Sequence, residues 1–387
     1  MIRKRLLARW RACSYRGERL FIFATLAMVV GLSTISAHAA IVTTGDVNPA
    51  NPATWTGSTP VTIANTADGS VTVNGGSTST TGRVTMATTF GVTGTLTVDG
   101  LGSTWNVGGI TAGTSSLPAN FAGGTGIVNI TNGGTINSGG TSRVFIGAAF
   151  NTTGYLNITN GGRLTGGTTL ADYLNSTGIM TVDGVGSSVS GGSISVGERG
   201  NGLLKILNGA TVSSGSSAGV ARYDTSTSRA IVDGLGSSWT MRQLLVGTGM
   251  ANGGSGAVGL LTVSNGATLS NQGPAQLGTL SNAVGTIMVN GASSSWTNIP
   301  GPSNCAGFSA PVCGLNVGIE GTGHVSISDG ATLTTNALYI NNQSRLTVDL
   351  GTGSTVTVGG GTGILTNDGT IRMAAKATAA SGTYTPI

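Results

Sequence analysis

One short pattern recurs along this chain and limits what the chain can fold into. The segment TVDGLGSTW begins at Thr97, and close copies begin at Thr181 (TVDGVGSSV), Ile231 (IVDGLGSSW) and Met288 (MVNGASSSW). A catalytic motif normally occurs once, whereas the structural unit of a repeat protein occurs in every repeat. The repetition therefore points first to architecture.

These segments belong to a broader unit of the form G-x-(L/I/V)-x-(V/I)-x-(N/D)-G. Its turn glycines are Gly75, Gly100, Gly133, Gly161, Gly184, Gly209, Gly234, Gly266, Gly291 and Gly330. Four of the nine spacings between them are 25 residues, and we interpret the longer ones as loop insertions. A fixed period of this length indicates a stacked repeat architecture.

Each unit contains three short strands. Alternating apolar residues predict a strand with one buried face, and the Asn-Gly or Asp-Gly pair then turns the chain because these residues tolerate positive φ. Two further short segments and two further bends complete about 25 residues. The pattern predicts an all-β fold, a single-stranded right-handed parallel β-helix (β-solenoid) of ten to twelve coils. The alternative is a β-propeller or sandwich, but propeller blades need ~40–50 residues.

Stacked coils place equivalent side chains in columns. We therefore expect structural roles for seven residues of the recurring segment: Trp105, Trp239 and Trp296 as core anchors, and Gly100, Gly184, Gly234 and Gly291 as corner residues. Val189 occupies the tryptophan position in the copy that lacks tryptophan.

The ends and one insertion depart from the repeat. Residues 40–66 contain three prolines and no copy of the unit, which predicts an N-terminal extension or cap before the array at 67–372. An insertion at about 298–314 holds Cys305 and Cys313, for which we expect a disulfide; two free thiols are the alternative. Residues 373–387 form a tail.

Residues 1–39 are typical of a secretory signal peptide. A basic segment precedes the apolar stretch LFIFATLAMVVGL, and AHAA then predicts cleavage near Ala39. A membrane anchor is the alternative, but the apolar stretch is short for a ~20-residue span. We expect a protein that passes through export machinery and is secreted or held at the cell surface or outer membrane of a Gram-negative bacterium.

Charge argues against a nucleic-acid partner. Residues 1–39 hold seven of the 18 Lys and Arg residues and one acidic residue, so the remainder has 11 basic and 12 acidic residues. No basic patch remains that would neutralise phosphates. The chain has 67 glycines, but the apolar residues between them favour a packed fold over disorder.

The polar residues suggest no catalytic, cofactor or metal site. Acidic residues at the turn position could pair as in glycosidases or lyases, but asparagine fills the same position equally well, so we expect turn chemistry there. The acidic set is Asp99, Asp183, Asp233 and Asp329, and the amide set is Asn132, Asn160, Asn208, Asn265 and Asn290. The calcium-binding nonapeptide GGxGxDxUx is absent, and His324 is the one histidine after residue 39, too few for a zinc site.

Two sets of residues keep a carbohydrate-related role open. The main local concentration of charge is Arg199, Lys205, Arg222, Asp224 and Arg242, and their convergence in a cleft would favour a polysaccharide lyase or hydrolase. Tyr155, Tyr173, Tyr223 and Tyr339 are candidates for stacking on sugars.

The recurring TVDGxGSxW and ITNGG units, after a long basic leader, resemble autotransporter passenger domains and related exported β-strand-repeat proteins over about residues 69–372. The resemblance implies a right-handed β-helix displayed at or beyond the outer membrane, often as an adhesin or surface-layer component. No C-terminal translocator barrel of about a dozen ~10-residue strands is recognisable. We expect a non-enzymatic surface or matrix protein that contacts an extracellular glycan or another cell; the alternatives are a carbohydrate-active β-helix and a truncated autotransporter passenger fragment.

Overall fold

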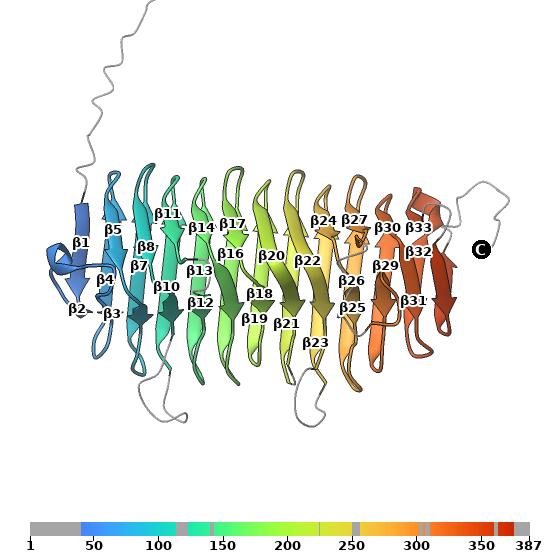
Figure 1. Cartoon of the computed structure of the whole chain (residues 1–387), viewed down its shortest axis with the longest axis horizontal. Helices are drawn as coiled ribbons and strands as arrows, with labels where there is room; N and C mark the ends of the chain where they lie inside the picture. Colours follow the sequence, from blue (N-terminus) through green and yellow to red (C-terminus); the bar gives the residue numbers. More distant parts are fainter. Residues whose placement is uncertain are drawn as a thin grey trace, which may run out of the picture. The chain divides into compact units, whose positions relative to one another are not determined.

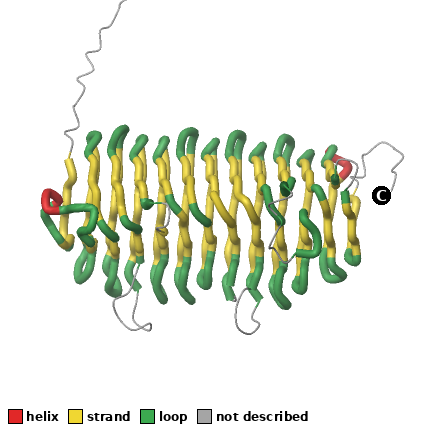
Figure 2. Tube along the Cα trace, viewed as in Figure 1, coloured by secondary structure: helices red, strands yellow, loops and turns green. Residues whose placement is uncertain are grey.

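The structure is a computed structural model that describes residues 40–113, 123–139, 143–223, 225–249, 256–301, 305, 310–359 and 363–374. The expected signal peptide, Asp224 and most of the expected tail lie outside these ranges. The described fold is all-β, with 57% strand and 2% helix, in parallel coils about 26 residues apart that make about 11 turns. Figures 1 and 2 show the coils stacked in chain order. The predicted β-solenoid is confirmed.

The first strand of each coil joins one 13-stranded sheet, in which every pairing is parallel except that of β1 with β4. Its strands, in spatial order, are β1 (Ala40–Gly45), β4 (Gly69–Asn74), β7 (Thr93–Asp99), β10 (Thr125–Thr131), β13 (Thr153–Thr159), β16 (Thr177–Asp183), β19 (Asn201–Leu207), β21 (Thr227–Asp233), β23 (Val258–Ser264), β26 (Val284–Asn290), β29 (Thr322–Ser328), β32 (Arg345–Asp349) and β35 (Thr370–Ala374).

The second and third strands of the coils stack in two further columns. The second strands are β5 (Thr78–Thr81), β8 (Thr104–Val107), β11 (Thr135–Asn137), β14 (Arg163–Thr165), β17 (Ser188–Gly191), β24 (Thr268–Asn271), β27 (Ser295–Asn298), β30 (Thr332–Thr335) and β33 (Thr355–Val358). The third strands are β3 (Val61–Ile63), β6 (Val84–Met86), β9 (Ile110–Ala112), β12 (Arg143–Ile146), β15 (Gly167–Leu170), β18 (Ile194–Val196), β25 (Ala275–Leu277), β28 (Leu315–Val317), β31 (Ala337–Ile340) and β34 (Ile364–Asn367). β20 (Thr211–Val220) and β22 (Ser238–Val246) continue through both columns.

The core is built from the alternation seen in the sequence. In β7, β10 and β13 the buried positions align in register, so that Leu96, Val128 and Leu156 form one column of fully buried side chains. Each such side chain contributes roughly 1.5–3 kcal/mol through burial. A single coil could not bury this edge alone, which is why the repeat must be stacked.

The glycine that opens each unit has a packing role. At Gly178, a Cβ atom would lie 2.5 Å from the backbone nitrogen of Ala171 and 2.5 Å from the carbonyl oxygen of Ile146. The neighbouring third strands therefore leave no room for a side chain at Gly178. Ser228 and Ser344 replace this glycine in two coils, and their hydroxyls accept hydrogen bonds from the backbone nitrogens of Gly202 at 2.9 Å and Gly323 at 2.8 Å.

The N-terminal end of the stack is closed by antiparallel pairing. β1 pairs with β4, and β2 (Val47–Asn48) pairs with β3, while η1 (Pro52–Thr54) leads to Trp55, whose ring stacks on Trp105 with centroids 5.7 Å apart. Parallel stacking begins with β3 on β6, inside residues 40–66. At the other end η3 (Leu350–Thr352) follows β32, and β35 pairs with β32.

The carboxylate of Asp46 stabilises this N-terminal end through hydrogen bonds. Its Oδ2 atom accepts hydrogen bonds from the backbone nitrogens of Asn65 (3.0 Å), Thr66 (2.6 Å) and Ala67 (3.2 Å). These bonds, above all those from Thr66 and Ala67, hold the pKa of Asp46 below its usual range.

Candidate functional site

The tryptophans of the recurring segment occupy one column of the second strands. In register from coil to coil, that column contains Ser79, Trp105, Ile136, Leu164, Val189, Val212, Trp239, Leu269, Trp296, Leu333 and Val356. All three tryptophans are fully buried. They are core residues, so they offer no exposed ring to a ligand.

Each buried indole N–H finds its acceptor two residues further along the second strand of the preceding coil. Trp105 Nε1 donates to Thr81 Oγ1 at 2.8 Å, and Trp239 Nε1 donates to Ser214 Oγ at 3.3 Å. Trp296 Nε1 donates to Asn271 Oδ1 at 2.9 Å. A tryptophan in one coil therefore requires a polar residue in the coil before it.

The corner of the recurring segment depends on two left-handed residues. The first is Gly100, Gly184, Gly234 or Gly291, with φ of 91°, 88°, 92° and 89° respectively, and the second lies two positions later. The serine after the second one is buried in all four copies. In one copy, Ser187 Oγ accepts a hydrogen bond from the Gly161 backbone nitrogen at 3.0 Å and donates to the Asp183 carbonyl at 2.7 Å. The segment thus joins two coils at a corner.

The expectation that aspartate and asparagine are interchangeable turn residues with positive φ is wrong for most of the aspartates. Positive φ is found at Asn132, Asn160, Asn208, Asn265 and Asp329. The last residue of a strand is instead Asp99, Asp183, Asp233 or Asn290. The carboxylates instead accept hydrogen bonds from asparagines of the next coil, each at 2.7 Å: Asn132 to Asp99, Asn208 to Asp183, and Asn265 to Asp233. The aspartates are links between coils.

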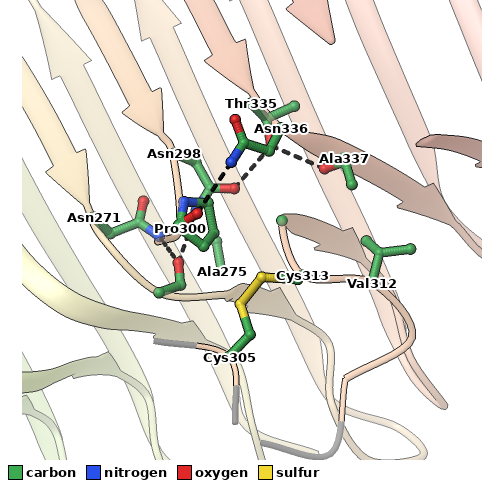
Figure 3. Close-up of a disulfide and its surroundings, with 12 residues drawn as sticks. Asn271, Ala275, Asn298, Pro300, Cys305, Val312, Cys313, Thr335, Asn336 and Ala337 are labelled. Atoms are coloured by element: carbon green, nitrogen blue, oxygen red, sulfur yellow. Dashed lines mark hydrogen bonds between the residues drawn. A yellow bond between two sulfur atoms is a disulfide. The ribbon is translucent and has the colours of Figure 1, made fainter. Parts of the chain in front are cut away.

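Cys305 and Cys313 form a disulfide, with Cα atoms 5.7 Å apart, in the connection between β27 and β28 (Figure 3). The chain after the bridge is held by Asn316, whose side chain bonds both the nitrogen and the carbonyl of Val312. Figure 3 also shows the neighbouring network in which Asn298 accepts from Thr335 Oγ1 at 2.8 Å. The disulfide covalently closes the inserted loop.

Two of the five charged residues singled out in the sequence meet at the corner between third and first strands. The guanidinium carbons of Arg199 and Arg222 lie 5.3 Å and 5.7 Å from the centroid of the Tyr223 ring. Arg222 Nη1 also lies 3.6 Å from Glu198 Oε1. Lys205 lies in β19 and Arg242 within β22, away from this corner, and Asp224 is outside the described residues.

This cluster follows from the coil register. Three successive coils form this corner in the same way. The second residue of the corner is Asp172, Glu198 or Arg222, and the third is Tyr173, Arg199 or Tyr223. Sequence reasoning missed Asp172 and Glu198 because it did not align these corner loops. Their spacings of about one coil are the signal that would have found them.

The carboxyl group of Asp172 has a shifted pKa. Burial raises the pKa of Asp172, and the nearby Glu198 carboxylate raises it further, whereas Arg199 and Arg143 act in the opposite direction. Glu198 is buried and ion-paired with Arg222.

A hollow of about 300 Å³ adjoins the cluster. It is lined by Phe150, Leu174, Asn175, Arg199, Gly200, Asn201 and Thr225, which come from four successive coils. The lining combines apolar walls with amide, hydroxyl and guanidinium groups, as small-molecule sites do. We take this hollow and the adjoining Arg–Tyr cluster as the candidate site.

The other residues considered from the sequence lie elsewhere. His324 pairs in register with Arg345 in the first sheet, and its pKa is lowered by burial and by that arginine. Tyr155 lies in β13 and Tyr339 in β31, whereas Tyr173 is exposed beside the candidate site.

Two further observations concern metal ligands and membrane-spanning helices. Among the residues that the structure describes, no three His, Cys, Asp or Glu side chains are grouped to hold a metal ion. Within the same ranges no helix has the length and apolar character needed to cross a membrane.

Comparison of the chain with protein-family models, with curated proteins and with solved structures found no match.

Proposed function

We propose that the protein is an exported β-solenoid that acts through its surface, as an adhesin or as a structural part of an extracellular matrix or cell coat, without catalysing a reaction. The proposal includes removal of residues 1–39 near Ala39 and a location in the medium or at the outer membrane of a Gram-negative bacterium. Its partners are an extracellular glycan or the surface of another cell.

The observation that carries this proposal is the repeated outer surface, which is rich in amides and hydroxyls and has few charges. Equivalent polar side chains bond to each other from coil to coil: Asn157 Nδ2 donates to Asn129 Oδ1 at 3.0 Å, and Asn137 Nδ2 donates to Asn106 Oδ1 at 2.9 Å. Such ladders order a long surface of amides and hydroxyls. A surface of this kind suits many weak contacts in parallel better than one catalytic centre.

A row of exposed aliphatic side chains supports the same proposal. The residue between the two left-handed positions of the corner is Leu101, Val185 or Leu235 in three coils, and these are 87%, 84% and 81% exposed. Exposed at equivalent positions of the corner, these side chains add apolar surface that a partner could contact.

Localisation and adhesion test the proposal. The producing cells would be fractionated, and the intact mass of the protein measured in medium, outer membrane and cytoplasm. We expect a mature form beginning near Ala40 outside the cytoplasm, and a deletion strain that attaches less well to surfaces or to other cells. Full-length protein retaining Met1 in the cytoplasm would contradict the proposal.

The carboxyl groups beside Arg199 favour a second candidate, a carbohydrate-active enzyme, because Asp172 has a raised pKa next to Glu198. Incubation with acidic and neutral polysaccharides, followed by assay of reducing ends and of unsaturated products, distinguishes the two. Activity that is lost in Asp172→Asn but kept in the corner variant Asp183→Asn would establish the enzyme. Absence of product with every polysaccharide favours the surface role.

A further inference from the structure

We propose that the hollow beside Arg199 binds a sugar residue that carries a carboxylate, such as a uronic acid unit of an extracellular polysaccharide. This inference deepens the proposed surface role, on which it rests, by assigning that role a binding site and a ligand class.

The hollow has one cationic group suited to a carboxylate. Within the described residues, Arg199 is the one charged side chain in the lining, and no carboxylate lies within salt-bridge distance of it. The neighbouring Arg222 is paired with Glu198 at 3.6 Å. Asp172 also belongs to this cluster; burial and the Glu198 charge raise its pKa, which favours its neutral form, and Arg199 opposes that shift. A planar guanidinium can bind a carboxylate through two parallel hydrogen bonds, which a neutral sugar does not offer.

Arg199 is held in place before any ligand arrives. Its guanidinium lies over the Tyr223 ring at 5.3 Å, and its backbone nitrogen donates to the Ala171 carbonyl at 3.1 Å. The Tyr223 nitrogen in turn donates to the Glu198 carbonyl at 3.0 Å. Coil-to-coil hydrogen bonds and a cation–π contact thus reduce the freedom that the arginine would lose on binding.

The remaining lining fits the rest of a sugar ring. Phe150 and Leu174 provide apolar surface for C–H groups, while Asn175, Asn201 and Thr225 provide amide and hydroxyl groups for the ring hydroxyls. Asn175 and Thr225 take left-handed backbone conformations, with φ of 58° and 69°. The volume of about 300 Å³ is at the lower end for ligand sites and suits a short stretch of a chain rather than a large cofactor.

The backbone that lines the hollow at Gly200 has no room for a side chain. A Cβ atom on Gly200 would lie 2.5 Å from the carbonyl oxygens of both Ser176 and Tyr173. The loop that carries Arg199 therefore packs directly on the loop of the preceding coil, which keeps the two sides of the hollow at a fixed separation.

Calorimetric titration of the purified full chain tests the inference. The probes are oligogalacturonate, the corresponding neutral oligogalactose, and acetate as a bare carboxylate. We expect oligogalacturonate to bind at least 10-fold more tightly than either of the others, because it alone engages the guanidinium and the apolar and amide groups together.

Arg199→Gln should weaken oligogalacturonate binding about 10- to 100-fold without changing the weak binding of oligogalactose. Lys205→Gln is the matched control, since it removes the same charge from a side chain that does not line the hollow. Each variant would be checked for an unchanged far-UV circular dichroism spectrum. Equal affinities for the acidic and neutral oligomers, equal losses in the two variants, or no binding at all would overturn the inference.

The two proposals can fail separately. An exported protein that does not bind oligogalacturonate would refute the uronate site and leave the proposed surface role intact. A cytoplasmic, unprocessed protein would refute the surface role whatever the calorimetry gives.

Discussion

Replacing Trp296 by phenylalanine should cost more than the same change at Trp239, although both side chains occupy one column of the core. Phenylalanine leaves a void of roughly 40 Å³, which at about 24 cal/mol per Å³ costs ~1 kcal/mol at either site. At Trp296 it also removes the donor to Asn271 Oδ1. Asn271 is buried, and an unpaired buried acceptor costs about 1–3 kcal/mol. We expect a total of about 2–4 kcal/mol.

At Trp239 the lost partner is the hydroxyl of Ser214, at the longer distance of 3.3 Å. A hydroxyl can rotate to offer its oxygen to another donor, whereas the Asn271 side chain is fixed by donating to the Gly273 carbonyl at 2.6 Å. We therefore expect Trp239→Phe to cost only about 1–2 kcal/mol, chiefly from the void.

Equilibrium unfolding of the full chain in urea, followed by far-UV circular dichroism, gives both values, with the m-value as a check that unfolding remains cooperative. The loss in the double variant of Trp296→Phe with Asn271→Ala should be smaller than the sum of the losses in the two single variants by about 1–2 kcal/mol. In the double variant both the donor and the acceptor are gone, so no buried polar group is left without its partner. Equal losses at Trp296 and Trp239, together with strict additivity in the double variant, would refute the reasoning.

Three further outcomes are expected. Gly178→Ala should destabilise by about 3 kcal/mol or more in urea unfolding, because its Cβ would meet backbone atoms 2.5 Å away, whereas Gly184→Ala, with open space around it, should cost only the ~1–2 kcal/mol of its left-handed backbone. Because folding lowers the pKa of Asp46, this carboxylate should stabilise the folded state at pH values above its unfolded pKa near 3.9, and that stabilisation should be lost as the pH falls through the folded pKa. Asp46→Asn should therefore flatten the curve of unfolding free energy against pH in that acidic range. Reducing Cys305–Cys313 should lower the free energy of unfolding by at most about 2–3 kcal/mol, since the loop spans only eight residues; a larger loss in thermal melts would mean that the bridge supports more than its loop.

Each part of the recurring segment has a structural role. Its apolar and aromatic positions fill the core, its two left-handed residues make the corner, and its serine bonds to the preceding coil, as Ser237 Oγ does with the Gly209 nitrogen at 2.9 Å. Its aspartate bonds to the following coil, as Asp233 does with Asn265. The segment recurs because it connects a coil to both neighbours.

The linear sequence alone determined the coil. Alternating apolar residues, glycine at the left-handed corner positions and a period near 25 residues are local signals, and they set the strands, the bends and the need to stack. The tryptophan column could be predicted in the same way, because Trp105, Trp239 and Trp296 keep the same offset from a turn glycine.

Only the tertiary structure decided which side chains meet between coils. Asp99 and Asn132 are 33 residues apart, and Asp183 and Asn208 are 25 apart, yet both pairs have the same 2.7 Å contact. Insertions of varying length between strands hide such pairings from any fixed spacing. The same is true of Arg199 and Tyr223, which come together because corner loops of successive coils lie one strand spacing apart.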